Sequence, residues 1–141
     1  MSWDITIMSG KDFPTDFPDV PHDWMPNPLG AASAVRRQIS QIFAETVWSD
    51  PGWGRFDGGE FRIEFNIGAK DSVATAALHV RGSGDPVTPI VSLCRKNGWV
   101  AVDWSDGQLI NLDTPSKENW EKWQWYRDQV VSAKKQRPDS N

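Results

Sequence analysis

The chain has 141 residues, of which 38% are apolar and 24% charged, a composition typical of one folded globular domain rather than a disordered chain. The formal net charge is −4, which does not suit non-specific nucleic-acid binding, because such binding depends on basic side chains that displace counterions. The single cysteine excludes an internal disulfide bond.

Charge is distributed unevenly along the chain. Residues 1–30 hold five aspartates and one lysine, whereas residues 117–141 hold six basic and four acidic side chains. An acidic body of this kind suits a basic protein partner. No apolar run is long enough to cross a membrane, and the first residues lack the basic and apolar segments of a signal peptide. We therefore expect a cytoplasmic protein.

The first predicted element is a strand over residues 3–8, in which every second residue is apolar. Residues 9–30 follow with five prolines, which lack an N–H group and restrict the residue before them. Three aromatic residues recur among these prolines: Phe13, Phe17 and Trp24. We predict an irregular loop held in place by its aromatic side chains, and loops of this length are often functional.

The middle of the chain predicts one helix and two long strands. Apolar residues recur at helical spacing over residues 31–44. A short extended piece at residues 46–48 leads into residues 49–54, where aspartate, proline and glycine predict a turn. Alternating apolar and polar residues mark a strand over residues 61–67, and another strand is predicted at residues 73–80.

The last third of the chain predicts two helices that flank a hairpin. Asp85 is expected to cap a helix that starts at Pro86 and ends at the Asn-Gly pair of residues 97–98. Residues 99–104 and 108–112 are predicted to pair around a tight turn.

The final helix is predicted to have its cap at Thr114 and its first residue at Pro115. Five of its side chains are expected to face the core: Trp120, Trp123, Tyr126, Val130 and Val131. Trp125 lies off this stripe, so we expect it to be exposed. Residues 134–141 are predicted to form a frayed tail.

These elements predict an α+β fold in a single domain of residues 1–141. The strands are joined by turns too short for the crossovers that parallel strands require. We therefore predict a two-layer sandwich, with a mostly antiparallel sheet of five or six strands and about three helices on one face.

Sequence motifs for catalysis or for metal and cofactor binding are not evident. The two histidines, His22 and His79, lie in no metal-ligand spacing, and no phosphate-binding or nucleophile motif is present. Cys94 falls on the apolar stripe of its predicted helix and is expected to be a buried core residue. We predict no catalytic residue, no metal site and no cofactor.

Tryptophan is the residue type that points most directly to binding, since it is a frequent anchor at protein interfaces. Trp24 and Trp53 lie in turn-rich segments close to aspartates. One interpretation is that both fold back over the core. The other is that they form an aromatic and acidic patch for a partner, with four contact residues: Trp24, Asp50, Trp53 and Asp57.

Five short segments resemble a family of small bacterial proteins with no assigned activity: residues 1–5, 28–30, 48–54, 63–68 and 78–82. The resemblance covers about residues 1–112 and excludes the last helix. The shared segments are turns and strand faces, so the resemblance implies no catalytic set. Small single-domain bacterial proteins of this type are similar to immunity proteins, which bind and neutralise a secreted toxin.

Three functional hypotheses follow. The first is a non-enzymatic, cytoplasmic protein-binding domain, an immunity protein whose acidic and aromatic surface docks on a basic toxin domain. The second is an enzyme or small-ligand binder with a pocket formed by His79, Glu64 and Arg81. The third is a self-associating structural domain with Trp125 in a homodimer interface.

Overall fold

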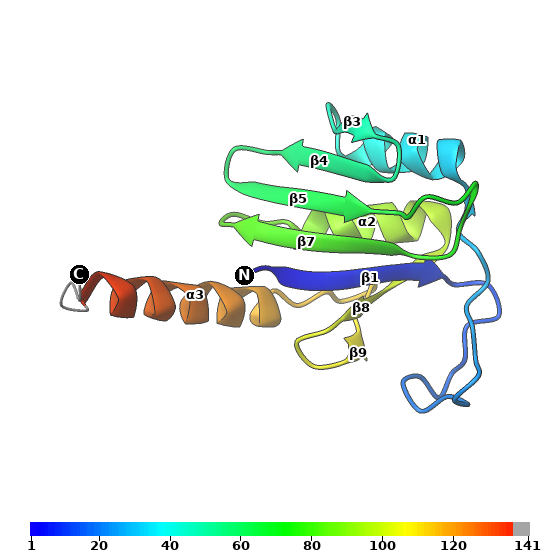
Figure 1. The fold of residues 1–141 in the computed structure, drawn as a ribbon. Helices are drawn as coiled ribbons and strands as arrows, with labels where there is room; N and C mark the ends of the chain where they lie inside the picture. Colours follow the sequence, from blue (N-terminus) through cyan, green and yellow to red (C-terminus); the bar gives the residue numbers. More distant parts are fainter. Residues whose placement is uncertain (137–141) are drawn as a thin grey trace.

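The computed structural model describes residues 1–136 and contains three helices and nine strands within them (Figure 1). The strands are β1 (Trp3–Ser9), β2 (Gly30–Ala31), β3 (Val47–Asp50), β4 (Trp53–Asp57), β5 (Phe61–Asn66), β6 (Ser72–Val73), β7 (Ala76–Gly82), β8 (Trp99–Asp103) and β9 (Gln108–Leu109). The helices are α1 (Ala32–Ile42), α2 (Val87–Asn97) and α3 (Glu118–Gln136).

Seven strands form the main sheet in the order β3-β4-β5-β7-β1-β8-β9, and β2 pairs with β6 in a separate small sheet. The strand pairs of both sheets are antiparallel. The first strand of the chain, β1, lies inside the sheet between β7 and β8 (Figure 1). Segments far apart in sequence therefore meet on neighbouring strands.

Apolar side chains of the central strands point to one face of the sheet, which α1 and α2 cover (Figure 1). Side chains alternate between the two faces of a strand, so Ile5, Phe65 and Leu78 are all fully buried on this face. Cys94 of α2 is buried among them as expected, and burial raises the pKa of its thiol from 9.0 to about 12.

The α+β class and the antiparallel sheet agree with the sequence prediction, but the number of strands does not. The sheet has seven strands rather than five or six, because β4 occupies residues expected to form a turn. Gly54 is a strand residue whose lack of a side chain leaves room for the Trp48 ring, since a Cβ atom there would lie 2.8 Å from it. The predicted strand at 73–80 is divided between β6 and β7.

Helix α2 begins at Val87 rather than at Pro86, and Asp85 binds the first turn of the helix as predicted. Asp85 Oδ1 accepts a hydrogen bond from the Thr88 backbone N–H at 3.1 Å, and Asp85 Oδ2 lies 3.2 Å from Lys117 Nζ, just before α3. Burial acts to raise the pKa of Asp85, but the hydrogen bonds from Thr88 and the charge of Lys117 outweigh it and lower the pKa below 3.8.

Helix α3 begins at the end of the sheet and is anchored by its first turns. Trp120 is buried, and its ring lies 5.5 Å from that of Trp3 and 5.1 Å from that of Trp123 (centroid to centroid). The Trp120 indole N–H donates to the Gly84 carbonyl at 2.9 Å. Helical geometry starts at Glu118, whose N–H is bound by the Ser116 hydroxyl, instead of at Pro115.

The rest of α3 projects past the sheet, so the helices do not form one layer of three as predicted (Figure 1). Tyr126 and Val131 were expected in the core but are 56% and 43% exposed, because α3 projects past the sheet instead of lying along it. Val130 is half-buried, and Trp125 is 65% exposed, as its position off the stripe predicts. The helix includes residues 134–136 of the predicted tail, and residues 137–141 lie outside the described residues.

Candidate functional site

The face of the main sheet opposite α1 and α2 is covered by no helix of residues 1–136 (Figure 1). We call it the open face. Its side chains come from β1, β4, β5, β7 and the residue after β8: Asp4, Thr6, Trp53, Arg55, Asp57, Arg62, Glu64, His79, Arg81 and Trp104. The fold thus brings ten polar and aromatic side chains from distant segments together on this face.

A chain of side-chain contacts crosses the middle of the open face. His79 Nδ1 lies 2.9 Å from Asp4 Oδ1, and the two residues are direct cross-strand partners on β7 and β1. The Trp53 ring stacks on the His79 ring with centroids 6.1 Å apart and planes inclined by 26°. These contacts join residues 4, 53 and 79, which only the sheet topology brings together.

A second pair lies beside this chain. Arg81 Nη1 is 2.5 Å from Glu64 Oε1, and Arg81 Nε donates to the Met1 carbonyl at 3.1 Å. Glu64 is also the cross-strand partner of His79. The structure thus brings His79, Glu64 and Arg81 onto the same surface.

Beside this pair the surface is hollowed. An open hollow of about 860 Å³ is lined by Glu64 and Arg81 together with Arg55 and Arg62, but not by His79. It is a wide depression in the sheet face and not an enclosed cavity. Glu64 and Arg81 are therefore paired with each other, and the hollow is open rather than a cleft in which its polar groups are enclosed.

Trp104 is a second tryptophan of the open face, and the sequence reasoning did not select it. It is 54% exposed, and its indole N–H donates to Thr6 Oγ1 at 2.7 Å. Its sequence position could have suggested it, because residues 99 and 104 are five apart and side chains an odd number of residues apart in an extended segment point to opposite faces.

Three of the four predicted partner contacts lie on the paired strands β3 and β4, and the fourth, Trp24, lies apart from them. Trp53 is half-buried on the open face, Asp50 is its direct cross-strand partner at the end of β3, and Asp57 ends β4 on the same face. Their carboxylates accept hydrogen bonds from the backbone N–H groups of Gly52 (2.8 Å) and Gly59 (2.9 Å), so both aspartates hold turns. Trp24 lies elsewhere, in the loop that follows β1, which is three places from β4 in the sheet.

That loop, residues 10–29, is held by an aromatic cluster. The ring of Phe13 lies 5.1 Å from that of Phe17 and 5.5 Å from that of Trp24, and Trp24 is half-buried. Met25 beside it is 76% exposed. Four aspartates of the loop are exposed: Asp12, Asp16, Asp19 and Asp23. The loop extends from the end of β1 away from the sheet and carries these exposed aspartates (Figure 1).

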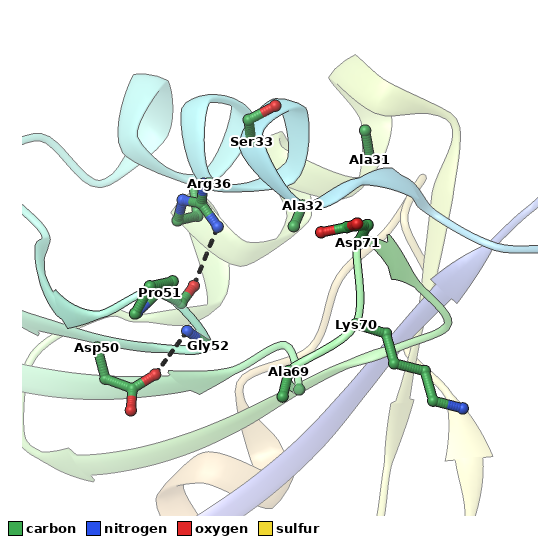
Figure 2. Close-up of a pocket in the computed structure, with 11 residues that line it drawn as sticks. Ala31, Ala32, Ser33, Arg36, Asp50, Pro51, Gly52, Ala69, Lys70 and Asp71 are labelled. Carbon is green, nitrogen blue, oxygen red and sulfur yellow. Dashed lines mark hydrogen bonds between the residues drawn. The ribbon is translucent and has the colours of Figure 1, made fainter.

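A second hollow, of about 520 Å³, lies between the start of α1 and the β3–β4 turn (Figure 2). Arg36 Nη1 donates to the Pro51 carbonyl at 3.2 Å, and the Asp50 carboxylate accepts from Gly52 within the same turn. Lys70 extends away from the hollow (Figure 2). Arg36 and Asp50, which line this hollow, therefore hold the turn in place.

Within residues 1–136, no three histidine, cysteine or carboxylate side chains are placed to hold a metal ion together. The helices of the same region include none with the length and apolar character needed to cross a membrane. Comparison with protein-family models, curated proteins and solved structures finds no match to this chain. The resemblance to a small bacterial family therefore stays a prediction.

Proposed function

We propose that this protein is a non-enzymatic protein-binding domain that docks through its open face, and that it acts as a cytoplasmic immunity protein that neutralises a toxin by direct binding. The observation that carries the proposal is the contact chain of Trp53, His79 and Asp4 on a sheet face that no helix of residues 1–136 covers. Aromatic side chains held rigidly among paired polar groups resemble the anchors of protein interfaces.

The chemistry of the partner follows from the charge of the chain. The exposed aspartates of residues 10–29 and the net charge of −4 favour a basic partner surface, such as that of a toxin which acts on nucleic acid. The aromatic cluster of the loop supports this, because an ordered loop loses less conformational entropy on binding than a disordered one. Binding would then block the basic surface sterically and electrostatically.

The test is capture of the partner by the tagged full chain from an extract of its host, read by mass spectrometry. We expect one stoichiometric basic protein, lost with Trp53→Ala or Trp104→Ala and retained with Trp125→Ala. The purified partner should be a toxin whose activity the wild-type chain inhibits. Equal capture by all variants, or a partner without inhibited activity, would contradict the proposal.

A second candidate function is supported by the Asp4–His79 contact. A carboxylate that binds one imidazole nitrogen orients the other, which is an arrangement used in acid–base chemistry. The neighbouring hollow, with Glu64 and Arg81, would hold a small ligand. A ligand screen by thermal shift distinguishes the two functions, because only this candidate predicts a small molecule whose stabilisation depends on His79.

A further inference from the structure

Three arginines of the open face come together on the neighbouring strands β4, β5 and β7. Arg62 and Arg81 are direct cross-strand partners, and Arg55 is the diagonal neighbour of Arg62. Opposed residues in an antiparallel pair have Cβ atoms about 5 Å apart, and like charges in that arrangement are destabilising. The opposition of Arg62 and Arg81 therefore costs stability, although Glu64 faces Arg55 and Asp57 faces Arg62 across β4 and β5.

All three arginines line the hollow of about 860 Å³. Glu64 lies between them, because it binds Arg81 at 2.5 Å and is the cross-strand partner of Arg55. Arg55 and Arg62 are exposed, and neither takes part in an ion pair within the part of the chain that the structure describes. Their cross-strand partners on the open face are carboxylates, Glu64 for Arg55 and Asp57 for Arg62. Neither carboxylate forms an ion pair with the arginine that it faces, so both guanidinium groups are available to a ligand.

Two further carboxylates, Glu45 and Asp57, also line the hollow. Both are exposed, and Asp57 is bound to the backbone of its own turn. With Glu64 they equal the three arginines in number, so recognition of an anion here rests on the forked geometry of the guanidinium groups and not on net charge. Planar guanidinium groups bind the oxygens of an oxyanion in pairs, which a diffuse positive charge cannot do.

We propose that this hollow binds the phosphate group of a small molecule. One arginine fork satisfies a carboxylate, as Arg81 does for Glu64, whereas a phosphate monoester has three terminal oxygens and a charge of about −1.5 to −2 at neutral pH. Arg55 and Arg62 bind the phosphate directly, and Arg81 joins them by exchanging Glu64 for the ligand. The site names a ligand class for the hollow of the second candidate function, and it does not depend on the proposed protein-binding function.

The experiment is calorimetric titration of the purified full chain with inorganic phosphate, with acetate at the same ionic strength as the comparison. Arg62→Gln should weaken phosphate binding about tenfold, since it removes a charge-assisted pair of hydrogen bonds. It should also raise the melting temperature slightly, because the like-charge pair with Arg81 is lost. Arg37→Gln, an exposed arginine of α1 outside the hollow, should leave phosphate binding unchanged.

Glu64→Gln should have the opposite effect on the affinity for phosphate. It removes the carboxylate that competes for Arg81, so phosphate should bind several-fold more tightly than to the wild type. The proposal is overturned if phosphate does not saturate a site, if acetate binds equally well, or if Arg62→Gln and Arg37→Gln have the same affinity. No partner protein is present in these titrations, so their failure is distinct from failure of the docking proposal.

Discussion

The two faces of the main sheet are built from alternate residues of the same strands, yet they use polar groups differently. On the covered face, one buried carboxylate stands out. Asp103 accepts hydrogen bonds from Trp3 (3.0 Å), Ser105 and Asn119, so it is satisfied entirely from within. On the open face, polar side chains bind each other across strands and keep solvent-facing surfaces. Alternation thus separates residues that stabilise the fold from residues available for binding.

The largest effect is expected within α3, where the helix passes from the core into solvent. Trp120→Ala should lower the free energy of unfolding by about 4 kcal/mol, because it removes a buried ring and leaves a cavity. Trp125→Ala in the same helix should change it by less than about 0.5 kcal/mol. Chemical denaturation of both variants measures the difference. Similar losses would mean that Trp125 is covered, as in the self-association hypothesis, and light scattering would then show a dimer.

The second prediction concerns the hydrogen bonds of the buried Asp103 carboxylate on the covered face. Asp103→Ala should cost about 3 kcal/mol, because the indole N–H of Trp3 and the amide of Asn119 lose a buried acceptor. Asp113→Ala is a matched control on the surface, where the carboxylate is 93% exposed. Thermal unfolding should separate the two variants clearly, and equal melting temperatures would contradict the role of Asp103.

Trp53 tests the open face. Trp53→Ala should lower stability by no more than about 1 kcal/mol, since the half-buried ring stacks on only one neighbouring ring. The same change should abolish capture of the partner. A large loss of stability would place Trp53 in the core, and the contrast between the two faces would then fail at this position.

The reactivity of the Cys94 thiol measures the burial of the covered face without a substitution. Its pKa is raised by burial to about 12, so the thiol should not react with a thiol reagent at pH 8 until the protein unfolds. The raised pKa stabilises the fold below the unfolded value of 9.0, and this contribution is lost as the pH rises from 9.0 towards 12. Labelling of the native protein at pH 8 would contradict the burial.

The smallest expected effect concerns Asp85. Its pKa is lowered in the folded state, so its contribution to stability is present above pH 3.8 and is lost as the pH falls through the folded value. Asp85→Asn keeps a capping side chain but removes the charge. Acid unfolding of this variant should be less steep below pH 5 by a fraction of about 1 kcal/mol, because the carboxylate is partly exposed. If stability fell equally with pH in the variant and the wild type, the lowered pKa of Asp85 would be contradicted.

Much of the candidate site was visible in the sequence only as separate parts. Strand alternation indicated that His79 and Glu64 point outwards, and the turn-rich setting of Trp53 singled it out. Their contacts could not be predicted, because β4, β5, β7 and β1 are adjacent only through pairing between distant segments. Asp50 and Asp57 were selected for their charge, yet hydrogen bonding within local turns explains where they lie.

The sequence by itself determined the α+β class, the irregular aromatic loop after β1 and most of the elements, because periodicity and turn chemistry are local properties. Tertiary structure alone decided that β1 lies inside the sheet, that Gly54 belongs to a strand beneath the Trp48 ring, and that α3 projects past the sheet. Each of these depends on packing between residues far apart in the chain, which no local pattern records.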